Sequence, residues 1–435
     1  MGDWLAVNEK GRLVLEGWDS VELAGRFGTP LYVLSEGAIR RRCGELRETF
    51  IDRWENASAV YAGKAFLTLA MCRIVQSEGL GLDLVSGGEL FTASAAGFPL
   101  DRALLHGNGK TGEELALALA SGVGRIVVDS LSELETLEEV ASSSGRTASV
   151  LLRVSPGVDP HTHRYIVTGH TGSKFGFPVA GDSLREAVRR AMGSSRVRLK
   201  GFHFHIGSQI FEKDSHVMSV DILTGAMAEF RRDLGLVTEE LNMGGGFGVD
   251  FTQEGRTPRI EEFTDAMMAR LSDRCLDLGM ERPRVVIEPG RWIVSEAGVT
   301  LYSVQTVKRL DGGLTYVAVD GGMSDNPRPS LYGAKYRAVA AGSMKEEATE
   351  VVTLAGKCCE SGDILVEGMR TPPLSRGDIV AVLNTGAYTF SMASNYNRIP
   401  RPAAVLVSPG RADVIAERQT YDDVLRWDRI PEHLR

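Results

Sequence analysis

Lys64 is the residue whose surroundings most clearly suggest chemistry. It lies in the segment YAGKAF, where its neighbours are small or apolar. A lysine is usually a solvated surface charge, and that is the bland interpretation here. Desolvation, however, lowers the pKa of a lysine and frees an amine that forms a Schiff base with an aldehyde. The sequence therefore makes Lys64 a candidate anchor for a carbonyl cofactor.

A glycine-rich segment, GGGFG at 244–248, is a candidate phosphate site. It lacks the Lys-Ser/Thr that follows in a P-loop, so a nest of backbone N–H groups that includes Gly245 and Gly246 is the better interpretation. Ser208 is a possible hydroxyl donor to the same group. Glycines after strands are often only turns, and the motif is weak by itself.

Two histidines and one acid are further candidate site residues. His203 and His205 alternate along a predicted strand, so both side chains point the same way. No Asp, Glu or Cys stands beside them at zinc-like spacing, which favours a wall for a flat ring, or packed histidines, over a metal. Glu288, in the segment EPGR with Gly290 and Arg291, is either a strand-end ion pair or an inward carboxylate. An aldehyde anchor, a phosphate nest, a ring wall and a carboxylate for a ring nitrogen are the requirements of pyridoxal phosphate.

Alternating strands and helices are predicted to position these residues. Between about residues 36 and 295, eight β-branched or apolar runs read as strands, each except the last followed by enough chain for a helix. They are Ala59–Tyr61, Leu82–Val85, Ala103–Leu105, Arg125–Val128, Val150–Val154, Leu199–Phe204, Glu240–Met243 and Val285–Ile287. Eight such units predict a (β/α)8 TIM barrel, with a doubly wound open sheet as the alternative. The candidate residues follow the strand ends, where barrels build their active sites.

The chain after residue 296 has a different texture. Six runs there have strand character, punctuated by Gly and Pro, and helical periodicity is scarce. We expect a C-terminal antiparallel β domain over 296–435 after a cofactor-binding barrel over 36–295. The N-terminal segment, 1–35, contains a strand-like run at Arg12–Glu16 that is a candidate partner for the C-terminal sheet.

Composition excludes several classes of function. The formal charge of −8 argues against a general nucleic-acid binder, and no apolar run approaches the roughly 18 residues of a membrane span. Five cysteines without a CxxC motif suit a reducing compartment, so we expect a cytoplasmic protein with free thiols at Cys358 and Cys359.

A set of segments, in order from about Gly28 to Val407, resembles a known family. The segments are YAGKAF, GLDLVSGGEL, HTHRYIVTG, SKFGF, HFHIGSQ, GGGFG, EPGR, CCESGD and GAYTFSMASNYN. They are similar to those of the diaminopimelate decarboxylases, which belong to the alanine-racemase-like, fold-type III class of pyridoxal phosphate enzymes. The resemblance implies a barrel with a C-terminal β domain, and a homodimer whose active sites are shared across the interface. It also implies decarboxylation of meso-2,6-diaminopimelate to L-lysine and CO2, the last step of lysine biosynthesis.

The resemblance also implies roles for individual residues. Lys64 would hold the cofactor, Gly246 and the segment Glu288–Arg291 its phosphate, Glu288 its pyridine nitrogen, and His205 would stack on the ring. Cys359 is similar to the proton donor of the family. The substrate contacts implied are Arg291, Arg328, Tyr332, Glu360 and Tyr388, the last also near the cofactor.

The distal end of the substrate separates the alternatives. Its carboxylate calls for fork-shaped cations such as Arg291 and Arg328, and its ammonium for an acid such as Glu360. A decarboxylase of ornithine, lysine or arginine on the same fold is the alternative. Its substrate has no distal carboxylate, so it would not need the paired arginines. A racemase of this class would place an arginine rather than Glu288 at the ring nitrogen. A non-catalytic, pyridoxal phosphate-binding regulatory homologue would not need a proton donor such as Cys359.

Overall fold

The computed structural model describes residues 4–159, 164–165, 173–252 and 257–435. The chain divides into two compact units, which we call the barrel unit and the β unit. The barrel unit comprises Arg42–Val249 and Thr257–Trp292, and the β unit comprises Met1–Arg41, Asp250–Arg256 and Ile293–Arg435. Of the segment HTHRYIVTG, only 164–165 lie inside the described residues.

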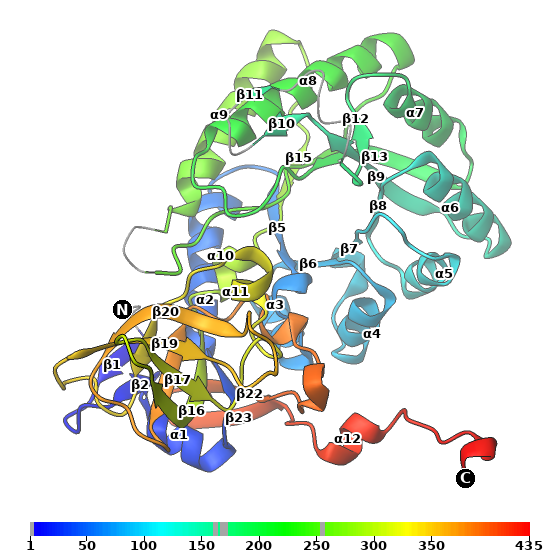
Figure 1. The fold of residues 1–435 in the computed structure, drawn as a ribbon. Coiled ribbons are helices and arrows are strands. Elements are labelled where there is room, and N and C mark those ends of the chain that lie inside the picture. The colour runs from blue at the N-terminus through cyan, green and yellow to red at the C-terminus, as the bar shows by residue number, and fades with distance from the viewer. Residues whose placement is uncertain (1–3, 160–163, 166–172, 253–256) are drawn as a thin grey trace. The chain divides into compact units, whose positions relative to one another are not determined.

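The barrel unit is a closed cylinder of eight parallel strands, as the sequence predicts (Figure 1). Each strand pairs with the next one along the chain, and β15 closes the ring by pairing with β5. The strands are β5 (Ala57–Ala62), β6 (Gly81–Leu84), β7 (Ala103–Leu105), β8 (Arg125–Val128), β9 (Ala148–Ser155), β13 (Val197–Phe204), β14 (Glu240–Asn242) and β15 (Arg284–Ile287). The short strand β12 (Phe177–Pro178) pairs with β9, and β10 (Val158–Asp159) pairs with β11 (Arg164–Tyr165).

Helices follow the strands, and side-chain caps fix where several of them begin. Thr68, Ser86, Thr111 and Ser130 each accept a hydrogen bond from the backbone N–H three residues later. In the described part of the chain these helices are α3 (Leu69–Ser77), α4 (Gly87–Ala95), α5 (Gly112–Ser121), α6 (Leu131–Ser143), α7 (Ser183–Gly193), α8 (Asp214–Leu234) and α9 (Ile260–Asp277). Ser86 of the SGGE segment is therefore a helix cap.

Inward-facing residues stack in layers inside the barrel. Buried Val60, Leu104, Val127, Leu151 and Val286 form one cluster. Side chains alternate along a strand, so the residues two positions further on face the same way. The apolar layer is therefore the floor on which the polar residues at the carboxyl ends of the strands lie.

The β unit contains a nine-stranded sheet around the long strand β16 (Gly298–Arg309). The other strands are β4 (Leu31–Ser35), β17 (Thr315–Val319), β18 (Ala338–Ala340), β19 (Glu350–Ala355), β20 (Ile364–Thr371), β21 (Ile379–Leu383), β22 (Ala403–Ser408) and β23 (Arg411–Ala416). Most pairs are antiparallel, as predicted, but β17 with β19 and β22 with β4 are parallel. The sheet is therefore mixed. Each parallel pair joins strands that are far apart in sequence, and the chain between them is long enough to return to the same end of the sheet.

The segment 1–35 pairs with the C-terminal sheet, but chiefly through another strand than the run Arg12–Glu16. The strand that joins the large sheet is β4, which lies between β16 and β22. Leu13–Leu15, the strand β2, pairs with β1 (Leu5–Val7) and β3 (Trp18–Asp19) in a small sheet, and its Leu13 N–H donates to the Ala341 carbonyl at 2.8 Å. All five residues of β4 are buried, so it lacks the alternating pattern that marks a half-exposed strand.

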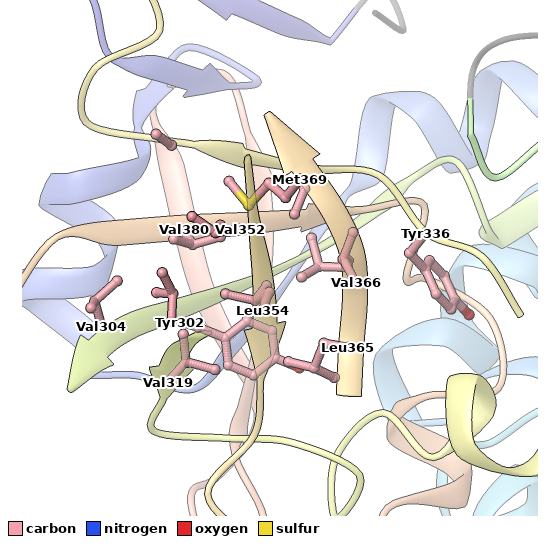
Figure 2. Packing of buried hydrophobic residues seen from close by; sticks show 14 of the residues in the cluster. Tyr302, Val304, Val319, Tyr336, Val352, Leu354, Leu365, Val366, Met369 and Val380 are labelled. Atoms are coloured by element: carbon pink, nitrogen blue, oxygen red, sulfur yellow. The ribbon is translucent and has the colours of Figure 1, made fainter. Parts of the chain in front are cut away.

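Apolar side chains from β16, β17, β19, β20 and β21 pack into the core of the β unit (Figure 2). Figure 2 shows Tyr302, Leu354 and Leu365 converging at its centre, with Tyr336 at one end. The remaining helices of the described chain are α1 (Ser20–Phe27), α2 (Glu36–Leu46), α10 (Arg291–Val294), α11 (Arg328–Tyr332) and α12 (Tyr421–Leu425). None of the helices in the described ranges is long and apolar enough to cross a membrane.

Candidate active site

Lys64 lies where the chain leaves the first barrel strand. It occupies a short 3-10 turn, Gly63–Ala65, and is half-buried. The hydroxyl of Tyr61 donates to the Phe66 carbonyl and closes this turn. The charge of Lys64 contributes to lowering the pKa of His205, after burial, which is the larger cause. The amine is therefore close enough to His205 for its charge to act on that ring.

Glu288, just after β15, is the centre of a buried polar network. Its Oε1 accepts a hydrogen bond from Asn242 Nδ2 at 2.7 Å and lies 2.9 Å from His106 Nε2. Its Oε2 lies 3.2 Å from Nε2 of His203. The rings of His106 and His203 meet edge to face, with centroids 4.8 Å apart. Groups from three other strand ends thus surround one carboxylate.

The charge state of this network follows from burial and pairing. Burial alone would raise the pKa of Glu288, but interactions with His106 and His203 outweigh it and hold the pKa well below its ordinary value. Burial lowers the pKa of His203 to about 4, so its ring is neutral at neutral pH. Burial raises the pKa of Asp83, which lies nearby on β6. Glu288 is therefore an ionised acid that can pair with a cationic group.

The glycine-rich segment after β14 forms a close-packed backbone turn. Gly246 has φ +98°, and a Cβ there would lie 2.4 Å from the Gly207 carbonyl oxygen. At Gly245 a Cβ would lie 2.2 Å from the carbonyl oxygen of Glu288. Only glycine fits either position. Within the described residues the N–H groups of Gly246 and Gly290 make no hydrogen bond, so both are available to an anion.

His205, Ser208 and Arg291 lie around this turn. His205 Nδ1 accepts the N–H of Gly245 at 3.2 Å, so a proton on the neutral ring is carried by Nε2. That bond occupies the Gly245 amide, which leaves Gly246 as the nearer donor of the nest. The exposed Ser208 hydroxyl accepts a hydrogen bond from the buried Arg291 guanidinium at 3.0 Å. A cation, a hydroxyl and free amides are a donor set that suits a phosphate.

The β unit holds a second cluster, around Arg328 at the start of α11. The Arg328 side chain is only 7% exposed, and its guanidinium lies 5.2 Å and 5.4 Å from the ring centres of Tyr332 and Tyr388. It has no ion pair with any acid of the described residues, and its Nε makes no hydrogen bond there. A buried cation without an acid is costly, so this site is suited to an anionic ligand.

Cys359 and Glu360 lie in the turn between β19 and β20. Both residues are exposed, and the Cys359 N–H donates to Asn397 Oδ1 at 2.8 Å. The preceding Cys358 is buried, and its N–H donates to the Asp363 carboxylate at 2.7 Å. Both thiols are free, as expected. Of the two residues, Cys359 is the exposed one.

Three residues of the barrel network were not predicted as site residues. Asp83 and Asn242 lie within predicted strands, and His106 stood out only as part of a strand-end segment. The usable signal was a polar residue inside a short predicted strand, Asp83 in GLDL and Asn242 in ELN. Two histidines and a carboxylate are also metal-ligand types, and here they meet although their spacing in sequence is not zinc-like. We interpret them as a hydrogen-bond network, since Asn242 already donates to the carboxylate.

Comparison with known proteins agrees with this geometry. Residues 36–295 match the model of the family "Pyridoxal-dependent decarboxylase, pyridoxal binding domain". The closed barrel with a separate sheet and this family match define a barrel-type pyridoxal-dependent decarboxylase.

Relatives over the full length narrow this class. The diaminopimelate decarboxylase of Bacillus subtilis is 44% identical over 421 residues, which cover 97% of this chain and 96% of the relative. That of Mycobacterium tuberculosis is 41% identical over 427 residues, covering 96% and 95%. The solved diaminopimelate decarboxylase from M. jannaschii, in complex with L-lysine, has a TM-score of 0.93 at 34% identity and covers 99% of both chains. The chain belongs to the diaminopimelate decarboxylase family.

Proposed function

We propose that this protein decarboxylates meso-2,6-diaminopimelate to L-lysine and CO2 with pyridoxal 5'-phosphate as cofactor. The observation that carries the proposal is the similarity to diaminopimelate decarboxylases over nearly the whole chain. The buried Arg328 without an acid partner supports it, because the distal carboxylate of this substrate is an anion that a simple diamino acid lacks. A lysine/ornithine decarboxylase from Vibrio vulnificus shares only 23% identity, a likeness in fold alone.

The barrel residues fit the cofactor. Lys64 is the amine for its aldehyde, and the amides of Gly246 and Gly290 with Arg291 and Ser208 are the donors for its phosphate. We assign His205 to stacking on the pyridine ring of the cofactor and Glu288 to pairing with its ring nitrogen. Tyr388, which belongs to the β unit, is assigned as a further cofactor contact. When bound, pyridoxal phosphate supplies the electron sink that accepts the electron pair left by the departing CO2. Glu288 keeps the ring nitrogen protonated, which strengthens that sink.

The substrate contacts are assigned to residues of both domains. Arg291 and Arg328 bind carboxylates, Glu360 binds the distal ammonium, and Tyr332 and Tyr388 border the site. We assign cofactor binding to the barrel at 36–295, followed by the C-terminal β domain at 296–435, with which the N-terminal segment 1–35 pairs. The exposure of Tyr332, Cys359 and Glu360 supports completion of the site by a second copy, in a homodimer. The five free cysteines suit a cytoplasmic enzyme.

The direct test is a product assay. Purified protein incubated with meso-diaminopimelate and pyridoxal phosphate should release CO2 and L-lysine in equal amounts. Ornithine and lysine, assayed in parallel, should give little putrescine or cadaverine. A preference for either of these diamino acids over diaminopimelate would contradict the proposed substrate. No product from any of the three would contradict the proposed reaction.

We expect Cys359→Ala to slow turnover strongly, and Cys358→Ala to affect it little. After CO2 leaves, a proton must be delivered to the substrate carbon. An ordinary thiol has a pKa of about 8.5, so it can donate a proton and recover it near neutral pH. Cys359 is exposed, whereas burial raises the pKa of Cys358 and keeps its thiol from solvent. Loss of such a group costs roughly 10²- to 10⁴-fold in rate. The measurement is kcat for both variants at saturating substrate.

Solvent deuterium incorporation provides the control for that prediction. In the wild type, lysine formed in heavy water should carry one deuteron in a single configuration. Cys359→Ala should yield mixed configuration, because water then delivers the proton from either side. Equal losses in both cysteine variants would indicate a structural thiol pair, and full activity of Cys359→Ala would assign the proton to another donor.

A further inference from the structure

His106 lies between two buried carboxylates of the barrel. It follows β7, and its Nε2 lies 2.9 Å from Oε1 of Glu288 and 3.6 Å from Oδ1 of Asp83 on β6. The three side chains are 6%, 6% and 3% exposed. One imidazole edge is thus shared by two acids that water scarcely reaches.

Two acids in such a place cannot both stay ionised without a nearby positive charge. Like charges repel strongly where water is excluded, and such a pair tends to retain one proton. Titratable groups that act on Asp83 or Glu288 lie on several elements of the barrel. They are Lys64 after β5, Glu89 on α4, Arg153 on β9, His203 on β13 and His205 after it. Of these, His203 contacts Glu288 beside His106.

The neighbouring groups have other roles. Lys64 and Arg153 act on the acids as cations, the ring of His203 is neutral, and Asn242 donates to Glu288 as an amide. His106 is the ring whose Nε2 edge faces both carboxylates. His106 is held in place by its backbone N–H, which donates to the Leu84 carbonyl at 2.7 Å, and by the edge-to-face contact with His203. Its position is fixed by strands β6, β7 and β13 rather than by a flexible loop.

We propose that His106 is a positioning residue that holds the Glu288 carboxylate aimed at the ring nitrogen of the cofactor and separates it from the carboxylate of Asp83. This rests on the proposed function, in which Glu288 pairs with that nitrogen. His106 itself touches neither substrate nor cofactor in this assignment. Its effect is on the proton of the ring nitrogen, which sets how strongly the ring withdraws electrons.

The test reads that proton directly. The full-length protein is loaded with pyridoxal phosphate labelled with nitrogen-15 at the ring nitrogen, and the chemical shift is measured by NMR. We expect a protonated nitrogen in the wild type. In His106→Gln we expect the resonance to move toward the unprotonated position and cofactor affinity to fall about ten- to a hundredfold. His106→Asn serves the same purpose if the glutamine variant does not fold.

A double variant separates positioning from packing. Asp83→Asn in the His106→Gln background removes the second carboxylate charge, so the protonated resonance should return. Glu133→Gln is the matched control, because Glu133 is a buried acid of the same barrel that pairs with Lys110 instead. It should lower the melting temperature and leave the nitrogen resonance unmoved.

Each result decides the matter. An unmoved resonance in His106→Gln, or a double variant as displaced as the single one, would overturn the inference and leave the proposed function intact. A wild-type protein that binds no labelled cofactor, or a Glu288→Gln variant whose resonance equals that of the wild type, would overturn the cofactor assignment and the inference with it.

Discussion

Lys64→Ala is expected to reduce decarboxylation to background and to abolish covalent retention of the cofactor. The amine lies at the end of β5 and its charge acts on the ring of His205, so no neighbouring group can substitute for it. Borohydride treatment of the wild type, followed by peptide mapping, should locate the cofactor on the peptide that contains Lys64. Because the side chain is half-buried and lies outside the apolar cluster, the stability change should be about 1 kcal/mol or less.

Two other lysines are controls for this result. Lys110 is buried, and its amine donates to the carbonyls of Gly107 and Val127 and to the carboxylate of Glu133. Lys110→Ala should therefore lower stability and keep the label on Lys64. Lys174 is exposed beside the Phe175 ring. A label found on Lys110 or Lys174 would refute the assignment.

Arg328→Ala should lower kcat/KM for diaminopimelate by about ten- to a hundredfold. A charge-assisted hydrogen bond contributes roughly 1.5–3 kcal/mol, and this guanidinium is buried between two tyrosine rings with no acid of the described chain to pair with. Arg328→Lys should recover only part of the loss, because an ammonium cannot make the paired, parallel bonds of a guanidinium. Steady-state kinetics on the three proteins measure the effect.

The control is an arginine of the same unit with an ordinary surface role. Arg309 is exposed and pairs with Glu350 across β16 and β19, so Arg309→Ala should leave kcat/KM unchanged. Any residual activity of the variants on lysine should fall less in Arg328→Ala than the activity on diaminopimelate does. Undiminished efficiency of Arg328→Ala on diaminopimelate would make this residue structural and weaken the proposed substrate.

The barrel was predictable because its information is local. Each strand is a short apolar run, the helices α3 to α6 each begin at a capping Ser or Thr, and the count of eight units fixes the architecture. The candidate roles of Lys64 and of the glycine-rich turn were likewise predicted from the residues next to them in the sequence. Asp83, His106 and Asn242 could not be assigned in this way, because their relation to Glu288 exists only after the ring of strands closes.

The β unit was less predictable for a related reason. Strand propensity indicates where β16 and β22 lie, but the partner and direction of a strand depend on distant segments. β4 is buried on both faces and therefore shows no alternation. β20 carries exposed Glu367 and Gly368 within its length, which interrupt its apolar pattern.

The position of β4 between β16 and β22 affects the nascent chain on the ribosome. β4 ends at Ser35, yet one partner strand begins at Gly298 and the other at Ala403. At roughly 5–20 residues per second, synthesis takes about 13–53 seconds to reach Gly298 and about 18–74 seconds to reach Ala403. Both backbone edges of β4 lack their sheet partners until β16 is made, and one edge lacks its partner until β22 is made. The first strand of the large sheet therefore remains a surface that can pair with other chains for as long as the barrel is being synthesised.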